Sequence, residues 1–206
     1  EFIAYINRHN ISVSSEITPS IYETNLFLNE KEHVTFIEYS AFFGSIQIFQ
    51  YLLMNNAELT PSLWLYSIHS GNAELFHILE SNHIIPPFYK SDKDKKEEEE
   101  EKEKVKEASH LSCLIESIKC HHNDFVEYIK DNLIQEQENE TATTKEEILF
   151  NSMKYHNYSY FQTELIKEKS FFYLCLYDYK KLVELLLKEK EEEIKKKIII
   201  STIIIQ

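Results

Sequence analysis

The chain has 206 residues and a formal net charge of −13, with 35 acidic side chains against 22 lysines and arginines. Such a charge repels phosphate groups, so it argues against nucleic acid and anionic membrane surfaces as partners. Hydrophobic residues make up 43% of the chain, enough for a sizeable core, and only 2 glycines and 4 prolines occur. This scarcity favours helices joined by short polar links over a fold with many tight β-turns.

Cysteine usage and the chain ends bear on location. The odd number of cysteines, Cys113, Cys120 and Cys175, and their wide spacing indicate a reducing compartment, so we expect a cytoplasmic protein. No signal peptide is visible near the start, and the first residue is Glu1 rather than Met, which is compatible with a fragment of a longer protein. The longest apolar run, 198–205, is shorter than the ~20 residues of a membrane span. We expect a monomer without membrane contact.

Residues 1–34 are predicted to form an atypical helical cap. Thr18-Pro19 is typical of a helix start, because Thr caps free N–H groups and Pro tolerates the first helical position. Ile21, Leu26 and Leu28 then supply apolar spacing. Terminal units of repeat arrays usually deviate from the pattern, so we interpret this segment as the end of the array that follows.

From Ala41 onward one pattern recurs. A small or apolar residue is followed three positions later by a turn residue, then four further on by an apolar pair, then by Leu or Ile. This spacing predicts one helix, a tight turn and a second amphipathic helix. Repetition predicts a solenoid of helix pairs. The expected turn residues are Gly44, Gly71, His121, His156 and Asp178.

The faces that turn inward can be assigned from the same periodicity. The first pair, from about residue 35 to 57, should end at Asn55-Asn56 with a left-handed cap, and Thr60-Pro61 should start the next helix. The inward residues are expected to be Ile37, Ser40 and Ala41, then Ile48, Phe49, Leu52 and Leu53, then Trp64, Ser67 and Ile68.

Two stretches interrupt or extend the array. Residues 90–109 are almost all charged and are predicted to be a solvated low-complexity insertion. The later helix pairs resume at 110, and Thr144 to Glu147 form a capping-box signature for the weaker fourth pair. The resulting domain boundaries are 1–34 for the cap, 35–89 and 110–188 for the repeats, 90–109 for the insertion, and 189–206 for a charged helix extension with an apolar tail.

The first pair resembles a known family. Ala41-x-x-Gly44-x-x-x-Ile48-Phe49-x-x-Leu52-Leu53-x-x-Asn56-Ala57 is similar to the ankyrin repeat, Ala-x-x-Gly-x-x-x-Ile/Val-Val-x-x-Leu-Leu-x-x-Gly-Ala. Residues 175–187 fit almost as well, and residues 35–188 outside the insertion look like the divergent protist type, an ankyrin-like domain of unknown function. The resemblance implies an all-α solenoid of degenerate ankyrin-like repeats, and a non-catalytic protein–protein interaction module.

Departures from the family move the expected binding surface. The opening Thr-Pro-Leu-His is replaced at Thr35 to Glu38, and Gly44 and Gly71 are 27 positions apart (71 − 44) rather than the ~33 of an ankyrin unit. The β-hairpin fingers that project from ankyrin repeats are therefore expected to be short. The expected binding surface is instead the concave face, at the residues just before each turn. This partner-binding strip comprises Phe42, Phe43, His69, Ser70, Lys119, Cys120, Lys154, Tyr155, Leu176 and Tyr177. The alternative is that Phe42 and Phe43 pack against the neighbouring unit.

No catalytic or cofactor motif is visible. His110-x-x-Cys113 and Cys120-His121-His122 contain zinc ligand types, but their spacing matches no standard finger, so we expect no metal and no cofactor. The chain lacks a Gly-rich phosphate loop, Gly-x-Ser-x-Gly and His-Glu-x-x-His, so we expect no enzyme. Two other functions stay open: the recognition arm of a larger regulatory enzyme of kinase or ubiquitin-ligase type, or a structural spacer whose insertion and tail bind partners.

Overall fold

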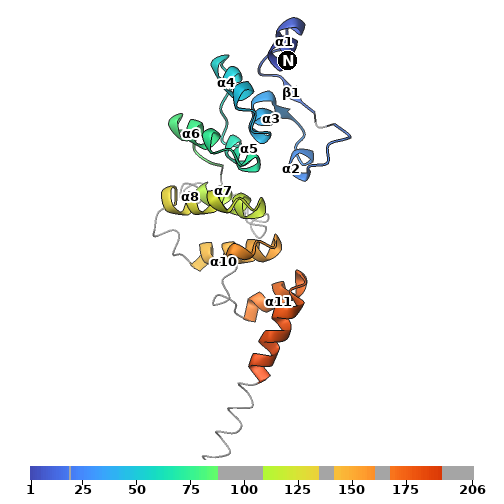
Figure 1. Ribbon diagram of the computed structural model, residues 1–206, viewed down its shortest axis with the longest axis vertical. Coiled ribbons are helices and arrows are strands. Elements are labelled where there is room, and N and C mark those ends of the chain that lie inside the picture. The colour runs from blue at the N-terminus through green and yellow to red at the C-terminus, as the bar shows by residue number, and fades with distance from the viewer. Residues whose placement is uncertain (19, 88–108, 135–141, 161–167, 192–206) are drawn as a thin grey trace, which may run out of the picture. The chain divides into compact units, whose positions relative to one another are not determined.

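The computed structural model describes residues 1–18, 20–87, 109–134, 142–160 and 168–191, and these are mostly helical (Figure 1). This confirms the all-α class apart from one two-stranded sheet. The chain divides into two compact units, Glu1–Thr141 and Ala142–Gln206. The predicted insertion, except for Ser109, and the predicted apolar tail lie outside the described residues.

The N-terminal segment of the first unit is only partly helical. Helix α1 (Phe2–His9) is followed by strand β1 (Glu16–Ile17), which pairs antiparallel with β2 (Val34–Thr35). Between the strands lies a single helical turn, α2 (Leu26–Asn29), capped by the Asn25 side chain. The helix start predicted at Thr18 is therefore wrong.

Local hydrogen bonds explain that difference. The hydroxyls of Ser12 and Ser20 accept bonds from the backbone N–H groups of Ser14 and Tyr22, two residues on in each case. Such bonds offer the backbone an alternative to helical pairing. The polar residues between α1 and α2 consequently form turns and a strand instead of a helix.

Three helix pairs follow in the first unit. They are α3 (Phe36–Phe42) with α4 (Ile46–Met54), α5 (Leu63–Ser70) with α6 (Ala73–Ser81), and α7 (Ser109–Lys119) with α8 (Asn123–Asn132). The first helices of successive pairs touch, because α3 packs on α5 and α5 packs on α7. Thr35 and Glu38 form a capping box at the start of α3, at the position where the family motif is replaced.

The predicted turn residues share one backbone conformation. All have a positive φ: 61° at Gly44, 66° at Gly71, 59° at His121, 55° at His156 and 60° at Asp178. At the first turn the Gly44 N–H bonds to the Ala41 carbonyl at 3.0 Å, and the Ser45 N–H bonds to the Ser40 carbonyl at 2.8 Å. This is the Schellman pattern, and the corresponding bonds recur at His121, His156 and Asp178.

The end of α4 and the buried faces of the helices can both be compared with the prediction. Asn56 has a φ of 63°, as expected for a left-handed cap. The inward residues predicted for α3 and α5 are all buried, whereas on α4 only Phe49 and Leu52 are buried, and Ile48 and Leu53 remain half-buried. Helix α5 begins at Leu63, two residues after Pro61, so the start predicted at Thr60-Pro61 lies slightly too early.

The second unit contains α10 (Ala142–Lys154), the short 3₁₀ helix η2 (Tyr158–Tyr160), α11 (Glu168–Leu176) and further helical residues over 180–191. Helix α10 packs on both η2 and α11, around a buried cluster of Leu149, Met153 and Leu174. Because α10 begins at Ala142, Thr144 lies inside the helix and is buried, so the capping box predicted there is wrong.

Candidate functional site

The structure brings together the strip residues that belong to the first unit. They occupy the last residues of α3, α5 and α7 or the position just after, and those helices are in contact. The rings of Phe42 and His69 stack at 5.2 Å between centroids, and the Cys120 Sγ lies 3.5 Å from the His69 Nδ1. Contacts between successive helix pairs therefore run directly through this strip.

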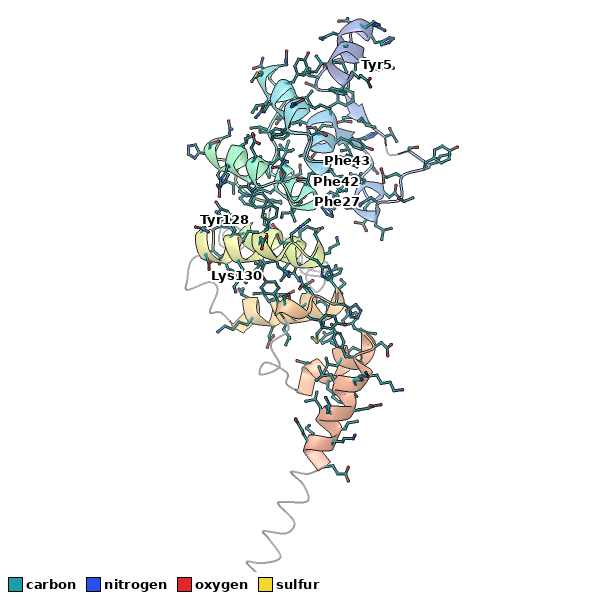
Figure 2. All side chains as sticks on the ribbon, in the orientation of Figure 1. Tyr5, Phe27, Phe42, Phe43, Tyr128 and Lys130 are labelled. Atoms are coloured by element: carbon teal, nitrogen blue, oxygen red, sulfur yellow. The ribbon has the colours of Figure 1, made fainter. Side chains whose placement is uncertain are left out.

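Helix α2 covers part of this surface. Figure 2 labels Phe27 together with Phe42 and Phe43. Between ring centroids, Phe27 lies 4.1 Å from His69, 4.9 Å from Tyr66 and 5.9 Å from Phe42, and Phe27 is only 7% exposed. Phe42 is half-buried as a result, while Phe43 remains 56% exposed. The packing alternative thus holds for Phe42, and Phe43 is left available at the surface.

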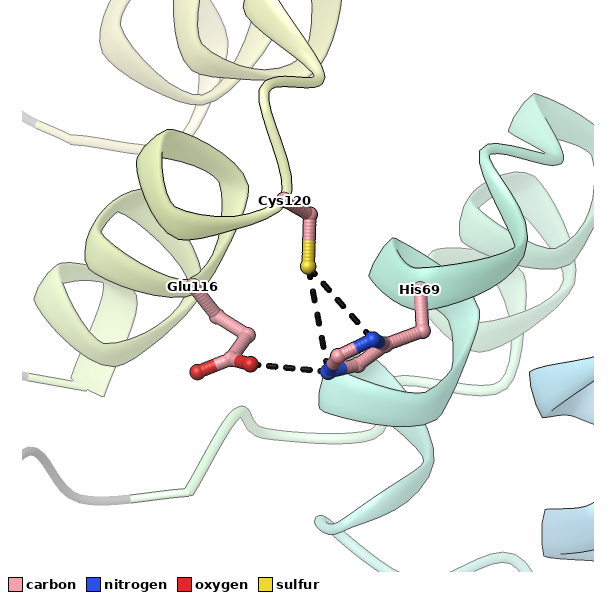
Figure 3. A group of neighbouring side chains, drawn as sticks. All are labelled: His69, Glu116 and Cys120. Carbon is pink, nitrogen blue, oxygen red and sulfur yellow. Dashed lines mark hydrogen bonds and ion pairs between the residues drawn. The ribbon is translucent and has the colours of Figure 1, made fainter. Parts of the chain in front are cut away.

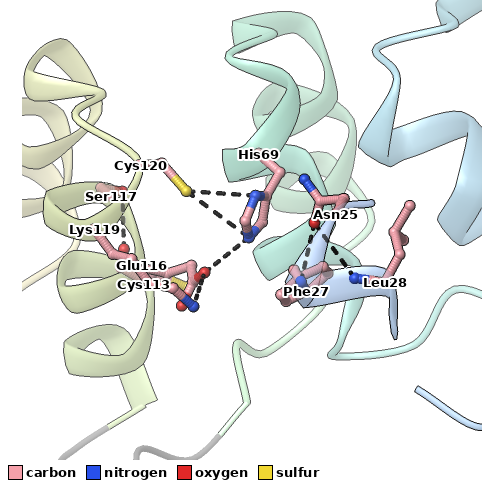
Figure 4. Close-up of polar contacts among 9 residues, drawn as sticks. All are labelled: Asn25, Phe27, Leu28, His69, Cys113, Glu116, Ser117, Lys119 and Cys120. Carbon is pink, nitrogen blue, oxygen red and sulfur yellow. Dashed lines mark hydrogen bonds and ion pairs between the residues drawn. The ribbon is translucent and has the colours of Figure 1, made fainter. Parts of the chain in front are cut away.

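A polar network continues from the strip into α7. The His69 Nε2 lies 2.8 Å from the Glu116 Oε1, and the Lys119 Nζ lies 3.1 Å from the same oxygen (Figure 4). The side chains of His69 and Glu116 are only 12% and 14% exposed. Burial alone would raise the pKa of the Glu116 carboxyl, but the hydrogen bond from His69 and the charge of Lys119 outweigh it and hold that pKa below its usual range.

The third member of this network is the thiol of Cys120 (Figure 3). Burial, and then the negative charge of Glu116, raise the pKa of the Cys120 thiol to about 12. Cys120, His69 and Glu116 are arranged as the nucleophile, the base and the orienting group are in enzymes with a cysteine nucleophile. So high a pKa disfavours, at neutral pH, the thiolate form that a nucleophile needs.

Among the residues that the structure describes, the other histidines and cysteines of the candidate zinc motif do not join this cluster. Cys113 is fully buried, which raises the pKa of its thiol to about 12. His121 is exposed in its left-handed turn, and the His122 ring lies against Gly71. Of the run that suggested a zinc site, Cys120 alone contributes, and its neighbours in space are His69 and Glu116.

The contact between His69 and Glu116 could not be predicted from local sequence, because 47 positions separate the two residues. The packing of Phe27 on the strip was not predicted either. A local signal for Phe27 exists: Asn25 precedes the apolar Leu26-Phe27-Leu28, and its Oδ1 accepts bonds from the N–H groups of Phe27 and Leu28. An Asn cap before an apolar run marks a helix start.

The strip residues of the second unit form an aromatic surface of their own. The Lys154 Nζ lies 5.8 Å from the centroid of Phe150 and 5.4 Å from that of Tyr155. Tyr177 lies 6.2 Å from the Phe150 ring. Leu176 is 57% exposed, and Phe172, one helical turn earlier, is 65% exposed. Apolar groups on α11 are thus presented to solvent.

No protein-family model, curated protein or solved structure shows significant similarity to this chain. Within the ranges that the structure describes, no helix has both the length and the apolar character needed to cross a lipid bilayer.

Proposed function

We propose that this chain is a non-catalytic protein–protein interaction module built on degenerate ankyrin-like repeats. The proposal is supported by the left-handed turn that recurs after each first helix and by the contacts of α3 with α5 and α5 with α7. Repeats that touch only their neighbours generate an extended surface, and such surfaces commonly bind protein partners.

The observation that carries the proposal is the exposure of Phe43 on the strip. More than half of this side chain faces solvent, although it sits among other rings, 5.0 Å from Phe42 and 4.9 Å from Tyr39 between centroids. A ring held by its neighbours loses little entropy when a partner covers it, and aromatic side chains supply much of the energy at interface centres. Phe43 is therefore the proposed anchor.

The test is site-specific photo-crosslinking in cells with a photoreactive phenylalanine analogue. We expect the analogue at position 43 to form a defined covalent adduct with one partner protein. The matched control places it at Met54, which is 80% exposed but lies at the end of α4, away from the strip. Identical adducts from both positions would contradict the proposal, as would no adduct from position 43.

Affinity for the captured partner then gives a quantitative check. Phe43→Ser should weaken binding at least tenfold, the loss expected when an interface anchor is removed, and Met54→Ser should leave it within about twofold. Because both side chains are mostly exposed, both variants should retain the circular dichroism spectrum of the parent chain.

A further inference from the structure

A cluster of three different donor atoms lies between α5 and α7. The histidine nitrogen of His69, a carboxylate oxygen of Glu116 and the sulfur of Cys120 all lie within 4.8 Å of one another (Figure 3). Nitrogen, oxygen and thiolate sulfur are the donors that zinc takes in proteins. We propose that these residues form a zinc site with a fourth coordination position for water or an external ligand.

The three donor atoms lie close to the spacing of a tetrahedral zinc site and must rearrange to reach it. With bonds of about 2.0–2.3 Å and tetrahedral angles, the donor atoms of a zinc site are about 3.3–3.6 Å apart. Here the His69 Nε2 lies 2.8 Å from the Glu116 Oε1 and 3.8 Å from the Cys120 Sγ. The first distance must lengthen and the second must shorten slightly, and the Glu116 oxygen and the Cys120 sulfur, which lie within 4.8 Å of each other, must come to the same spacing. Rotations of the Glu116 and Cys120 side chains supply these movements.

The donor set also selects among metals. Calcium and magnesium prefer sites made of oxygen atoms, whereas a mixed set with imidazole and thiolate favours zinc and its neighbours among the transition metals. Binding forms bonds from zinc to N, O and S and releases the thiol proton of Cys120 to solvent, because a coordinated thiol is deprotonated by the divalent charge.

The surroundings hold the ligands in place. The His69 ring contacts two aromatic neighbours, Phe27 at 4.1 Å and Phe42 at 5.2 Å between centroids, and this packing limits the rotation of the imidazole. Glu116 and Cys120 lie four residues apart on the end of α7, so they share one face of that helix. Zinc would therefore join two successive helix pairs.

The positive charge of Lys119 competes with zinc for the Glu116 carboxylate. Its Nζ lies 3.1 Å from the same Glu116 oxygen that zinc would take, so binding must displace a positive charge. Lys119→Met keeps a long apolar side chain and removes that competition. The variant should bind zinc at least tenfold more tightly than the parent chain.

The experiment titrates the intact, tag-free chain with Zn²⁺ in competition with a chromophoric chelator. We expect one equivalent bound, and at least a hundredfold loss of affinity in Cys120→Ser and in His69→Gln. The controls are Cys175→Ser and His121→Asn, which remove an exposed thiol and an exposed imidazole outside the cluster. These should bind as the parent does.

Cobalt gives a readout of the metal–thiolate bond itself. Co²⁺ in the site should produce a thiolate-to-metal charge-transfer band in the parent chain and in Cys175→Ser, and none in Cys120→Ser. Loss of the band in Cys175→Ser instead, or zinc affinities of Cys120→Ser and His69→Gln equal to that of the parent, would overturn the proposal. No stoichiometric binding by Lys119→Met would overturn it as well.

Discussion

The packing of successive turns can be tested by adding one carbon atom at each glycine. Gly44 and Gly71 have nearly the same φ, 61° and 66°, so Ala at either position carries the same left-handed strain. That strain costs about 1–2 kcal/mol. Their surroundings differ: a Cβ at Gly44 would lie 3.4 Å from the Ser70 Cβ, whereas one at Gly71 would lie 3.0 Å from the His122 Cε1.

This difference sets the expected magnitudes. The contact at Gly44 is an ordinary van der Waals distance, so Gly44→Ala should lower the free energy of unfolding by the strain alone. The contact at Gly71 requires the His122 ring to move by a few tenths of an ångström, and a rotation that strains its rotamer adds about 0.5–1.5 kcal/mol. Gly71→Ala should therefore cost about 1.5–3.5 kcal/mol in all. Combining it with His122→Ala should remove the extra cost, while Gly44→Ala and His122→Ala should be additive.

The assay is urea unfolding followed by the fluorescence of Trp64. This is the single tryptophan of the chain, and it lies 2% exposed in α5, so its signal reports on the first unit. Equal costs for Gly44→Ala and Gly71→Ala, with no coupling to His122, would refute the contact between successive turns. A cost below 0.3 kcal/mol for both would refute the left-handed turns themselves.

Three further predictions follow from single contacts. Phe27→Ala should lower the stability of the first unit by about 3–4 kcal/mol in the Trp64 assay, and a cost below 1 kcal/mol would mean that α2 does not pack there. Asp178→Gly should stabilise the second unit by about 0.5–1 kcal/mol in thermal unfolding, because glycine tolerates the φ of 60°; a destabilised variant would contradict this. Tyr128→Phe removes the 2.8 Å bond to Glu80 and should cost about 1 kcal/mol at pH 7. Burial, and then this bond, raise the pKa of Tyr128 from 10.0 to about 12. The contribution of the bond to stability is therefore full below pH 10 and is lost as the pH rises towards 12. The stability difference between the parent chain and the variant should shrink over that range.

The turns and the inward faces of the helices could be predicted because both depend on residues close together in the sequence. A left-handed residue is marked by Gly, or by His and Asp, which tolerate that conformation better than most side chains. His121 and Asp178 accordingly take nearly the same φ as Gly44 although they carry side chains and glycine does not. Burial of Ile37, Ser40 and Ala41 likewise follows from helical periodicity alone.

The N-terminal segment and the polar cluster could not be predicted in this way. The pairing of β1 with β2 joins Glu16 to Thr35 across a polar stretch that carries no strand periodicity. The cluster depends on the approach of α7 to α5, which brings Glu116 to His69 from the far side of a charged insertion. Contacts between residues so distant in sequence are fixed by tertiary packing, and composition or spacing does not encode them.

The proposed strip would not present a uniform row of binding residues, because its members differ in what already covers them. Phe42 and His69 have their ring faces against Phe27, so a partner could reach them only by displacing α2. Displacing α2 would expose Phe27 and Leu28, which are 7% and 0% exposed, and this costs several kcal/mol before any contact is gained. On the proposed function, a partner would gain most from Phe43, which is exposed and already held by its neighbours, while the partly buried His69 and Cys120 suit the proposed ion better than a protein surface.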